Sequence, residues 1–211
     1  MNRSRLIDKL AVSLCCCFFA IISIKAQTSR FFSPAFFELS NYLTAQVVAD
    51  FNGDGIADVA TSNGFDPGEA DILLGNGDGT FGETQTYELG GAGPAAIAAG
   101  DFNRDGKLDL VVADRGNDFG FGAINGNRVS VLLGNGDGTF QNSSVFGAGP
   151  FPNSVAVADF NNDGKPDIVV ANDKQNIGTV SVLIGRGDGT FAHPVAYATP
   201  PPGKVGSSQR F

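Results

Sequence analysis

The 211-residue sequence predicts an all-β protein, a partial β-propeller with three four-stranded antiparallel blades and flanking strands. Two motifs each occur three times. A nine-residue stretch starts at Asp50, Asp101 and Asp159, at intervals of 51 and 58 residues (101 minus 50, and 159 minus 101). The motif Gly-x-Gly-Asp-Gly-Thr-Phe recurs at residues 75–81, 134–140 and 185–191. The runs between these motifs are short, rich in β-branched residues and bounded by Gly, Asn and Asp, which is typical of strands and turns.

The third repeat shows the four predicted strands of one blade most clearly. Residues 154–158 lead into the nine-residue stretch and residues 167–171 leave it. Residues 179–184 form the third strand, and residues 190–197 close the blade. The Gly-x-Gly-Asp-Gly motif between the third and fourth strands predicts a hairpin, because its glycines tolerate the positive φ of tight turns.

Residues 1–26 are predicted to be a secretory signal rather than part of the fold. Arg3, Arg5 and Lys9 precede an apolar run at residues 10–24, and Ala26 suits cleavage before Gln27. The alternative is an uncleaved anchor, although 15 apolar residues are few for a membrane span. All three cysteines lie in this run. The mature chain would therefore be secreted, free of cysteine and without a membrane span.

The charge of the mature chain argues against two classes of partner. Residues 1–26 contain four basic side chains and one acidic one, which leaves 10 Lys and Arg (14 minus 4) against 21 Asp and Glu (22 minus 1), net −11. Such an acidic surface repels phosphate groups, so nucleic acid and anionic lipid are not expected partners.

Each nine-residue stretch has the ligand spacing of a calcium loop. Side-chain oxygens occupy positions 1, 3, 5 and 9, glycine occupies position 6, and the carbonyl of position 7 can add a ligand. An EF-hand is rejected because its position 12 is acidic, whereas these loops have Thr61, Val112 and Val170 there. The phenylalanine at position 2 is predicted to pack inward. We predict about one Ca²⁺ per repeat, three in all, with these ligands: Asp50, Asn52, Asp54, Ile56 and Asp58; Asp101, Asn103, Asp105, Lys107 and Asp109; Asp159, Asn161, Asp163, Lys165 and Asp167.

These motifs, with the segment Phe-Gly-Ala-Gly-Pro at residues 146–150, resemble the FG-GAP, or VCBS, repeats over about residues 31–199. The resemblance implies a β-propeller of the kind found in integrin α-subunit heads and many secreted bacterial proteins. The repeats would span residues 27–202, with a tail at 203–211 that starts an incomplete further blade. Phe31 precedes Asp50 by 19 residues, as Phe140 precedes Asp159, which predicts a flanking strand before the first blade.

Three blades are fewer than the four to eight that close a propeller. A fragment or truncated member of a larger propeller is therefore expected, with possible self-association through open blade edges.

The sequence favours a binding protein over an enzyme. His193 is the only histidine, and no paired carboxylates recur outside the loops. We predict a non-catalytic binding or adhesion scaffold whose partner is an unidentified extracellular protein or glycan. The alternatives are a lectin-like propeller, which the absence of Trp disfavours, and the non-catalytic part of a polysaccharide-active enzyme. Residues 114–127 form an insertion in the second repeat, either a recognition loop or a tolerated insertion.

Overall fold

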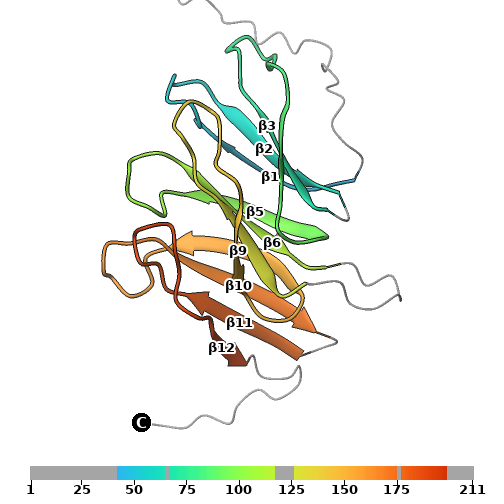
Figure 1. Cartoon of the computed structure of the whole chain (residues 1–211), viewed down its shortest axis with the longest axis vertical. Coiled ribbons are helices and arrows are strands. Elements are labelled where there is room, and N and C mark those ends of the chain that lie inside the picture. The colour runs from blue at the N-terminus through green and yellow to red at the C-terminus, as the bar shows by residue number, and fades with distance from the viewer. Residues whose placement is uncertain (1–41, 65–66, 117–125, 175–176, 199–211) are drawn as a thin grey trace, which may run out of the picture. The chain divides into compact units, whose positions relative to one another are not determined.

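The computed structural model describes residues 42–64, 67–116, 126–174 and 177–198. The chain divides into two compact units, Met1–Phe36 and Phe37–Phe211, and every described residue lies in the second. In the described ranges the regular secondary structure is all β-strand, and twelve strands form three four-stranded antiparallel sheets (Figure 1). The prediction of an all-β chain with three four-stranded blades is confirmed.

In each sheet the four strands lie side by side in chain order. The first sheet contains β1 Leu43–Ala49, β2 Asp58–Asn63, β3 Glu69–Leu73 and β4 Gln85–Glu88. The second sheet contains β5 Pro94–Gly100, β6 Asp109–Asp114, β7 Arg128–Leu132 and β8 Ser144–Gly147. The third sheet contains β9 Pro152–Ala158, β10 Asp167–Lys174, β11 Ile177–Leu183 and β12 Val195–Ala198.

The two repeated motifs connect neighbouring strands of each sheet, as predicted. The nine-residue loop joins the first strand to the second, and the Gly-x-Gly-Asp-Gly-Thr-Phe turn leads from the third to the fourth. The predicted fourth strand at residues 190–197 is wrong at its start, because β12 begins only at Val195. Phe191 makes an isolated bridge to Gly185, and Pro194, which has no N–H to donate to a ladder, precedes the strand.

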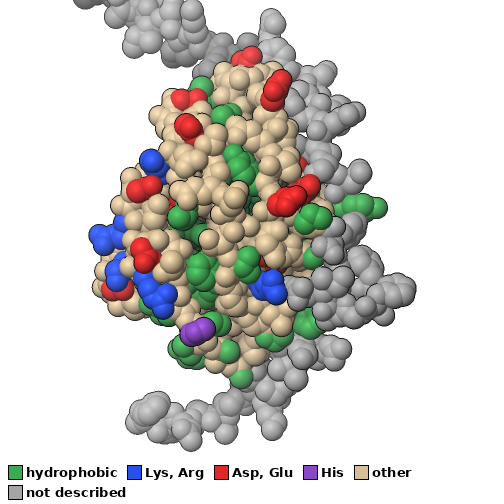
Figure 2. Space-filling view, in the orientation of Figure 1, with side chains coloured by type: hydrophobic (Ala, Val, Ile, Leu, Met, Phe, Trp, Pro, Cys, Tyr) green, Lys and Arg blue, Asp and Glu red, His purple; other side chains and the backbone are tan. Residues whose placement is uncertain are grey.

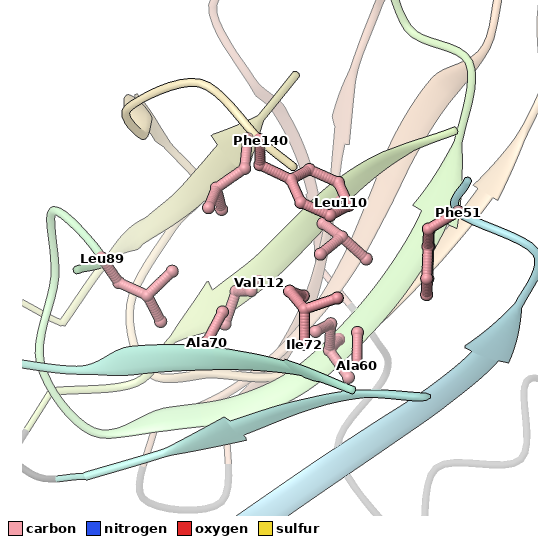
Figure 3. Close-up of a cluster of buried hydrophobic side chains, with 10 residues drawn as sticks. Phe51, Ala60, Ala70, Ile72, Leu89, Leu110, Val112 and Phe140 are labelled. Carbon is pink, nitrogen blue, oxygen red and sulfur yellow. The ribbon is translucent and has the colours of Figure 1, made fainter. Parts of the chain in front are cut away.

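A continuous apolar cluster lies between the first and second sheets (Figure 3). Phe140, from the turn of the second sheet, meets Phe51 and Tyr87 of the first repeat edge-on, with ring centroids 5.7 Å apart in both pairs. Burial of each large apolar side chain contributes about 1.5–3 kcal/mol. The fully buried members of the cluster are Ala60, Ala70, Ile72, Leu110, Val112 and Leu132.

The junction between the second and third sheets repeats this arrangement. Phe191 packs edge-on against Phe102 and Phe146, with centroids 5.4 and 5.2 Å away. One backbone hydrogen bond accompanies the aromatic contacts at each junction: the amide of Gly138 donates to the Phe51 carbonyl at 3.2 Å, and the amide of Gly189 to the Phe102 carbonyl at 3.0 Å. The second sheet is therefore packed on both faces.

The prediction that position 2 of every loop packs inward holds for two loops and is wrong for the third. Phe51 and Phe102 are 2% and 1% exposed, whereas Phe160 is 50% exposed. Phe51 and Phe102 are covered by an aromatic ring of the following sheet. No sheet follows the third one in the described part of the chain, so Phe160 has no such ring over it.

Several predictions fall outside the described residues. These are the signal at 1–26, the flanking strand from Phe31, the tail at 203–211 and residues 117–125 of the insertion. No segment that the structure describes is a helix long and apolar enough to cross a bilayer.

Candidate metal-binding loops

The aspartate at position 1 organises each loop by accepting hydrogen bonds from the loop's own amides. In the first loop Asp50 Oδ1 accepts from the amides of Gly53 and Asp54 at 2.7 and 3.2 Å, and Oδ2 accepts from Gly55 at 2.8 Å. Asp101 and Asp159 accept from positions 5 and 6 of their loops in the same way. The loop thus wraps around this carboxylate.

The side-chain oxygens at positions 3 and 5 also accept hydrogen bonds from amides of the loop. Asn52 Oδ1 accepts from the amide of Asp54 at 3.0 Å, and Asp54 Oδ1 accepts from the amide of Ile56 at 2.7 Å. The second and third loops repeat both bonds at 2.9–3.1 Å. Alternate side chains are thereby held along one short turn, and in the first two loops the position 3 amide also donates to the position 5 carboxylate.

The glycine at position 6 is required by the backbone, as predicted. Its φ is +83° in Gly55, +82° in Gly106 and +80° in Gly164, a region that side chains with a Cβ rarely adopt. Position 4 is also left-handed, and there Arg104 and Asn162 replace the glycine of the first loop. The three loops therefore share one backbone path despite their different side chains.

The aspartate at position 9 has a different environment from positions 1, 3 and 5. Asp58, Asp109 and Asp167 are fully buried. In each, one oxygen accepts from the amide of the position 2 phenylalanine at 2.8–2.9 Å, and the other accepts from the first glycine of the following turn at 2.8 Å. This residue joins the loop to the turn. Sequence reasoning missed this role, although the recurrence of both motifs together was a signal for it.

Burial raises the pKa of Asp109 to about 6, against the hydrogen bonds from the amides of Gly134 and Phe102 that lower it. Asp105 and Asp101 raise the pKa further, because they place negative charge nearby. A cation bound in the loop would lower the pKa of Asp109, because positive charge nearby favours the ionised carboxylate.

Lysines accompany the carboxylates in two of the loops. Lys165 Nζ lies 3.2 Å from Asp163 Oδ2, and Lys107 Nζ lies 3.9 Å from Asp105 Oδ2. Partial desolvation raises the pKa of Asp163, but the hydrogen bond from Lys165 and those from other neighbours outweigh it, and the pKa is lowered. The first loop has Ile56 at this position and carries no lysine. Figure 2 shows acidic and basic side chains close together on the left of the view, where Figure 1 places these loops.

The aspartates of the Gly-x-Gly-Asp-Gly-Thr-Phe turns are not part of this arrangement. Oδ1 of Asp78, Asp137 and Asp188 accepts from both the hydroxyl and the amide of the threonine two residues later. The threonine hydroxyl is the main reason that the pKa of each aspartate is lowered. These bonds close the turn.

The donor set of each loop fits a hard cation such as Ca²⁺ by its chemistry. Positions 1, 3 and 5 supply carboxylate and amide oxygens on partly or fully exposed side chains, as Ca²⁺ prefers. In the described residues no group of three or more His, Cys, Asp or Glu side chains is already gathered as a metal site. The carboxylates instead face the loop amides, and the position 7 carbonyl ligand remains a prediction.

Comparisons with known proteins point to one family. A family model described as an FG-GAP-like repeat matches residues 50–112, 114–170 and 159–208. A second model, described as an FG-GAP repeat, matches residues 93–132. No curated protein matches the chain. All three nine-residue loops lie within the matched segments.

Proposed function

Because this chain belongs to the FG-GAP-like repeat family, we propose that it is a secreted, calcium-binding scaffold without catalytic activity. Its partner would be an extracellular protein or glycan. Repeats of this family support a propeller-type binding or adhesion scaffold, and the three sheets agree with that architecture. The calcium part rests on one observation: the same oxygens are held by the same amides in three loops that differ in their other side chains.

In this proposal the residues of each loop have two different roles. Positions 1, 3 and 5 bind the cation through exposed oxygens. The position 9 aspartate, which the spacing also predicts as a ligand, accepts backbone hydrogen bonds through both oxygens and holds the loop against the following turn. Bound Ca²⁺ would supply positive charge that offsets the repulsion between the loop carboxylates. The nine-residue loop connects the first two strands of its sheet, so its rigidity helps to keep them in register.

The first loop is the best place to test calcium binding, because it has no lysine that competes for the position 5 carboxylate. We expect Asp54→Asn to lower the calcium stoichiometry, measured by titration calorimetry, from about three to about two. The melting temperature should fall relative to the unchanged chain with calcium but not with chelator. Glu83→Gln, which neutralises an exposed carboxylate outside the loops, is the matched control. An unchanged stoichiometry in Asp54→Asn would refute the ligand assignment.

Asp58→Asn in the same loop separates binding from folding. An Asn side chain offers one acceptor oxygen and points its NH₂ group at the second backbone amide, leaving that buried donor unpaired. We expect a loss of about 1–3 kcal/mol in the free energy of unfolding even with chelator. If Asp58→Asn is as stable as Asp54→Asn in chelator, Asp58 does not hold the loop to the turn.

Secretion is tested independently of calcium. Export of the full chain from cells, followed by N-terminal sequencing, should give a mature chain that begins at Gln27. A chain retained in the cell with residues 1–26 intact would contradict the secreted part of the proposal.

A further inference from the structure

Each sheet has a trailing face, which we define as the face that the next sheet along the chain covers in the first two repeats. In the first sheet this face contains the cross-strand row Val47, Ala60, Ile72 and Gln85. In the second sheet the corresponding row is Ala98, Val111, Val131 and Ser144. The middle two residues of both rows are at most 1% exposed. The next sheet therefore buries these positions completely.

The trailing face of the third sheet has the same apolar pattern, and no sheet in the described part of the chain covers it. Its corresponding row is Ala156, Val169, Val182 and Val195, and the adjacent row includes Val180 and Tyr197. Val195 and Tyr197 are 51% and 58% exposed, and the exposed ring of Phe160 belongs to the same side. We call these six row residues the open face. None of the six is charged.

The opposite, leading face of the first sheet is a poor match for the open face. It contains the row Gln46, Thr61, Asp71 and Thr86, in which the Thr86 hydroxyl donates to Asp71 at 2.6 Å. The corresponding row of the second sheet is Ile97, Val112, Ser130 and Val145. Docking the polar row on the open face would place a carboxylate against valines. Thr61 and Asp71 are also already buried.

The surface that fits the open face best is the open face of a second copy. The six residues of the open face are uncharged, so two copies can pack these rows face to face at about 10 Å without bringing like charges together there, even though each chain carries a net charge of −8. Asp173 lies on the same face, beyond these rows at the end of β10. We propose that two copies of this chain associate through their open faces about a two-fold axis. Such an interface is isologous, so association ends at two copies.

The test is the mass of the full chain, measured by light scattering and sedimentation over a range of concentrations with calcium present. We expect twice the mass of one chain and nothing larger. Val195→Glu and, independently, Tyr197→Glu should raise the dimer dissociation constant at least tenfold. Because both side chains are more than half exposed, neither substitution should unfold the protein, and circular dichroism checks this.

Val48→Glu is the matched control. Val48 is 59% exposed and lies in the first strand of its sheet, on the leading face, where a head-to-tail assembly would need it. The dimer should survive this substitution. A mass of one chain at all concentrations would overturn the proposal. So would growth beyond two copies, or dissociation of the dimer by Val48→Glu, because both would indicate head-to-tail contacts.

Discussion

Asp114 is a buried carboxyl at a position where the other two sheets have asparagine. It ends β6, and the same position holds Asn63 in the first sheet and Asn172 in the third. All three residues are almost fully buried, and each has a side-chain oxygen without a hydrogen bond. The other oxygen of Asp114 accepts from the Ser130 hydroxyl at 2.6 Å. A group that can ionise thus occupies a site that two neutral amides occupy elsewhere.

We predict that Asp114 makes stability depend on pH. Burial raises the pKa of Asp114 to about 7, although the Ser130 hydroxyl and the Arg128 guanidinium oppose the increase. In the unfolded chain the pKa is about 3.9, so the unfolded state loses its proton first as the pH rises. The contribution of Asp114 to the free energy of unfolding is then highest below about pH 4 and falls by up to about 4 kcal/mol toward pH 7.

Asp114→Asn should remove this loss and leave the variant more stable than the unchanged chain at pH 8. Urea unfolding at pH 5 and pH 8, at one fixed calcium concentration, measures the difference. Asp173→Asn, at an exposed residue of β10, is the control and should leave the pH dependence unchanged. Parallel pH profiles for Asp114→Asn and the unchanged chain would show that Asp114 is not the responsible group.

At the residue scale the sequence predicted the glycine at position 6, because a left-handed φ is a local requirement of one turn, while the ligand positions remain a prediction. It did not reveal that Asp58, Asp109 and Asp167 bond to backbone amides from two motifs. The partner glycine lies 17, 25 and 18 residues later in the chain. Only the folded sheet brings that amide to the carboxylate.

At the scale of elements, the contact between the nine-residue loop and the following turn leaves no room for a side chain. A Cβ added to Gly75, Gly134 or Gly185 would lie 2.1–2.3 Å from the carbonyl oxygen of loop position 8. That oxygen belongs to the backbone, so no rotation of a side chain relieves the clash. The glycine is therefore required by close packing and not by a left-handed φ.

Gly134→Ala should lower the free energy of unfolding by about 2–4 kcal/mol, because the loop and turn must separate to admit the methyl group. Gly147→Ala is the matched control: its Cβ meets nothing within 4 Å, so it should be neutral or slightly stabilising. Urea unfolding of both variants, with and without calcium, measures the contrast. Equal free energies of unfolding for the two variants would mean that the turn can move away from the loop without loss of stability.

The sequence predicted the order of strands in every sheet but overestimated the last strand of the third. The pattern at residues 190–197 predicts a continuous strand, yet the ring of Phe191 packs against Phe102 and Phe146 instead. Pairing with β11 resumes only at Val195. The strand propensity of residues 190–197 could not predict the late start of β12, because the competing contact of Phe191 comes from another sheet.

At the scale of the whole second unit, identical motif positions differ in burial because the sheets stack in sequence. The second sheet has a neighbour on each face, whereas the trailing face of the third has none among the described residues. The repeat predicted the blades themselves. It could not predict the exposure of Phe160, because that exposure depends on whether another sheet covers the loop and not on the loop's own residues.

Phe102 and Phe160 occupy the same loop position, so a pair of substitutions measures the stacking directly. Phe102→Ala removes a ring that is 1% exposed and should lower the free energy of unfolding by about 3–5 kcal/mol at any protein concentration. Phe160→Ala removes a ring that is half exposed, so in a single chain its cost should be below about 1 kcal/mol.

If two copies cover the open face, the cost of Phe160→Ala should instead grow with protein concentration. Dimerisation stabilises the folded chain by mass action, so the melting temperature of the unchanged protein should rise with concentration. That of Phe160→Ala should rise less, while that of Phe102→Ala should be lower but rise in parallel with the unchanged chain. A decrease in the free energy of unfolding for Phe160→Ala that equals that for Phe102→Ala and does not vary with concentration would show that the chain itself already buries Phe160. The open face would then be covered within a single chain.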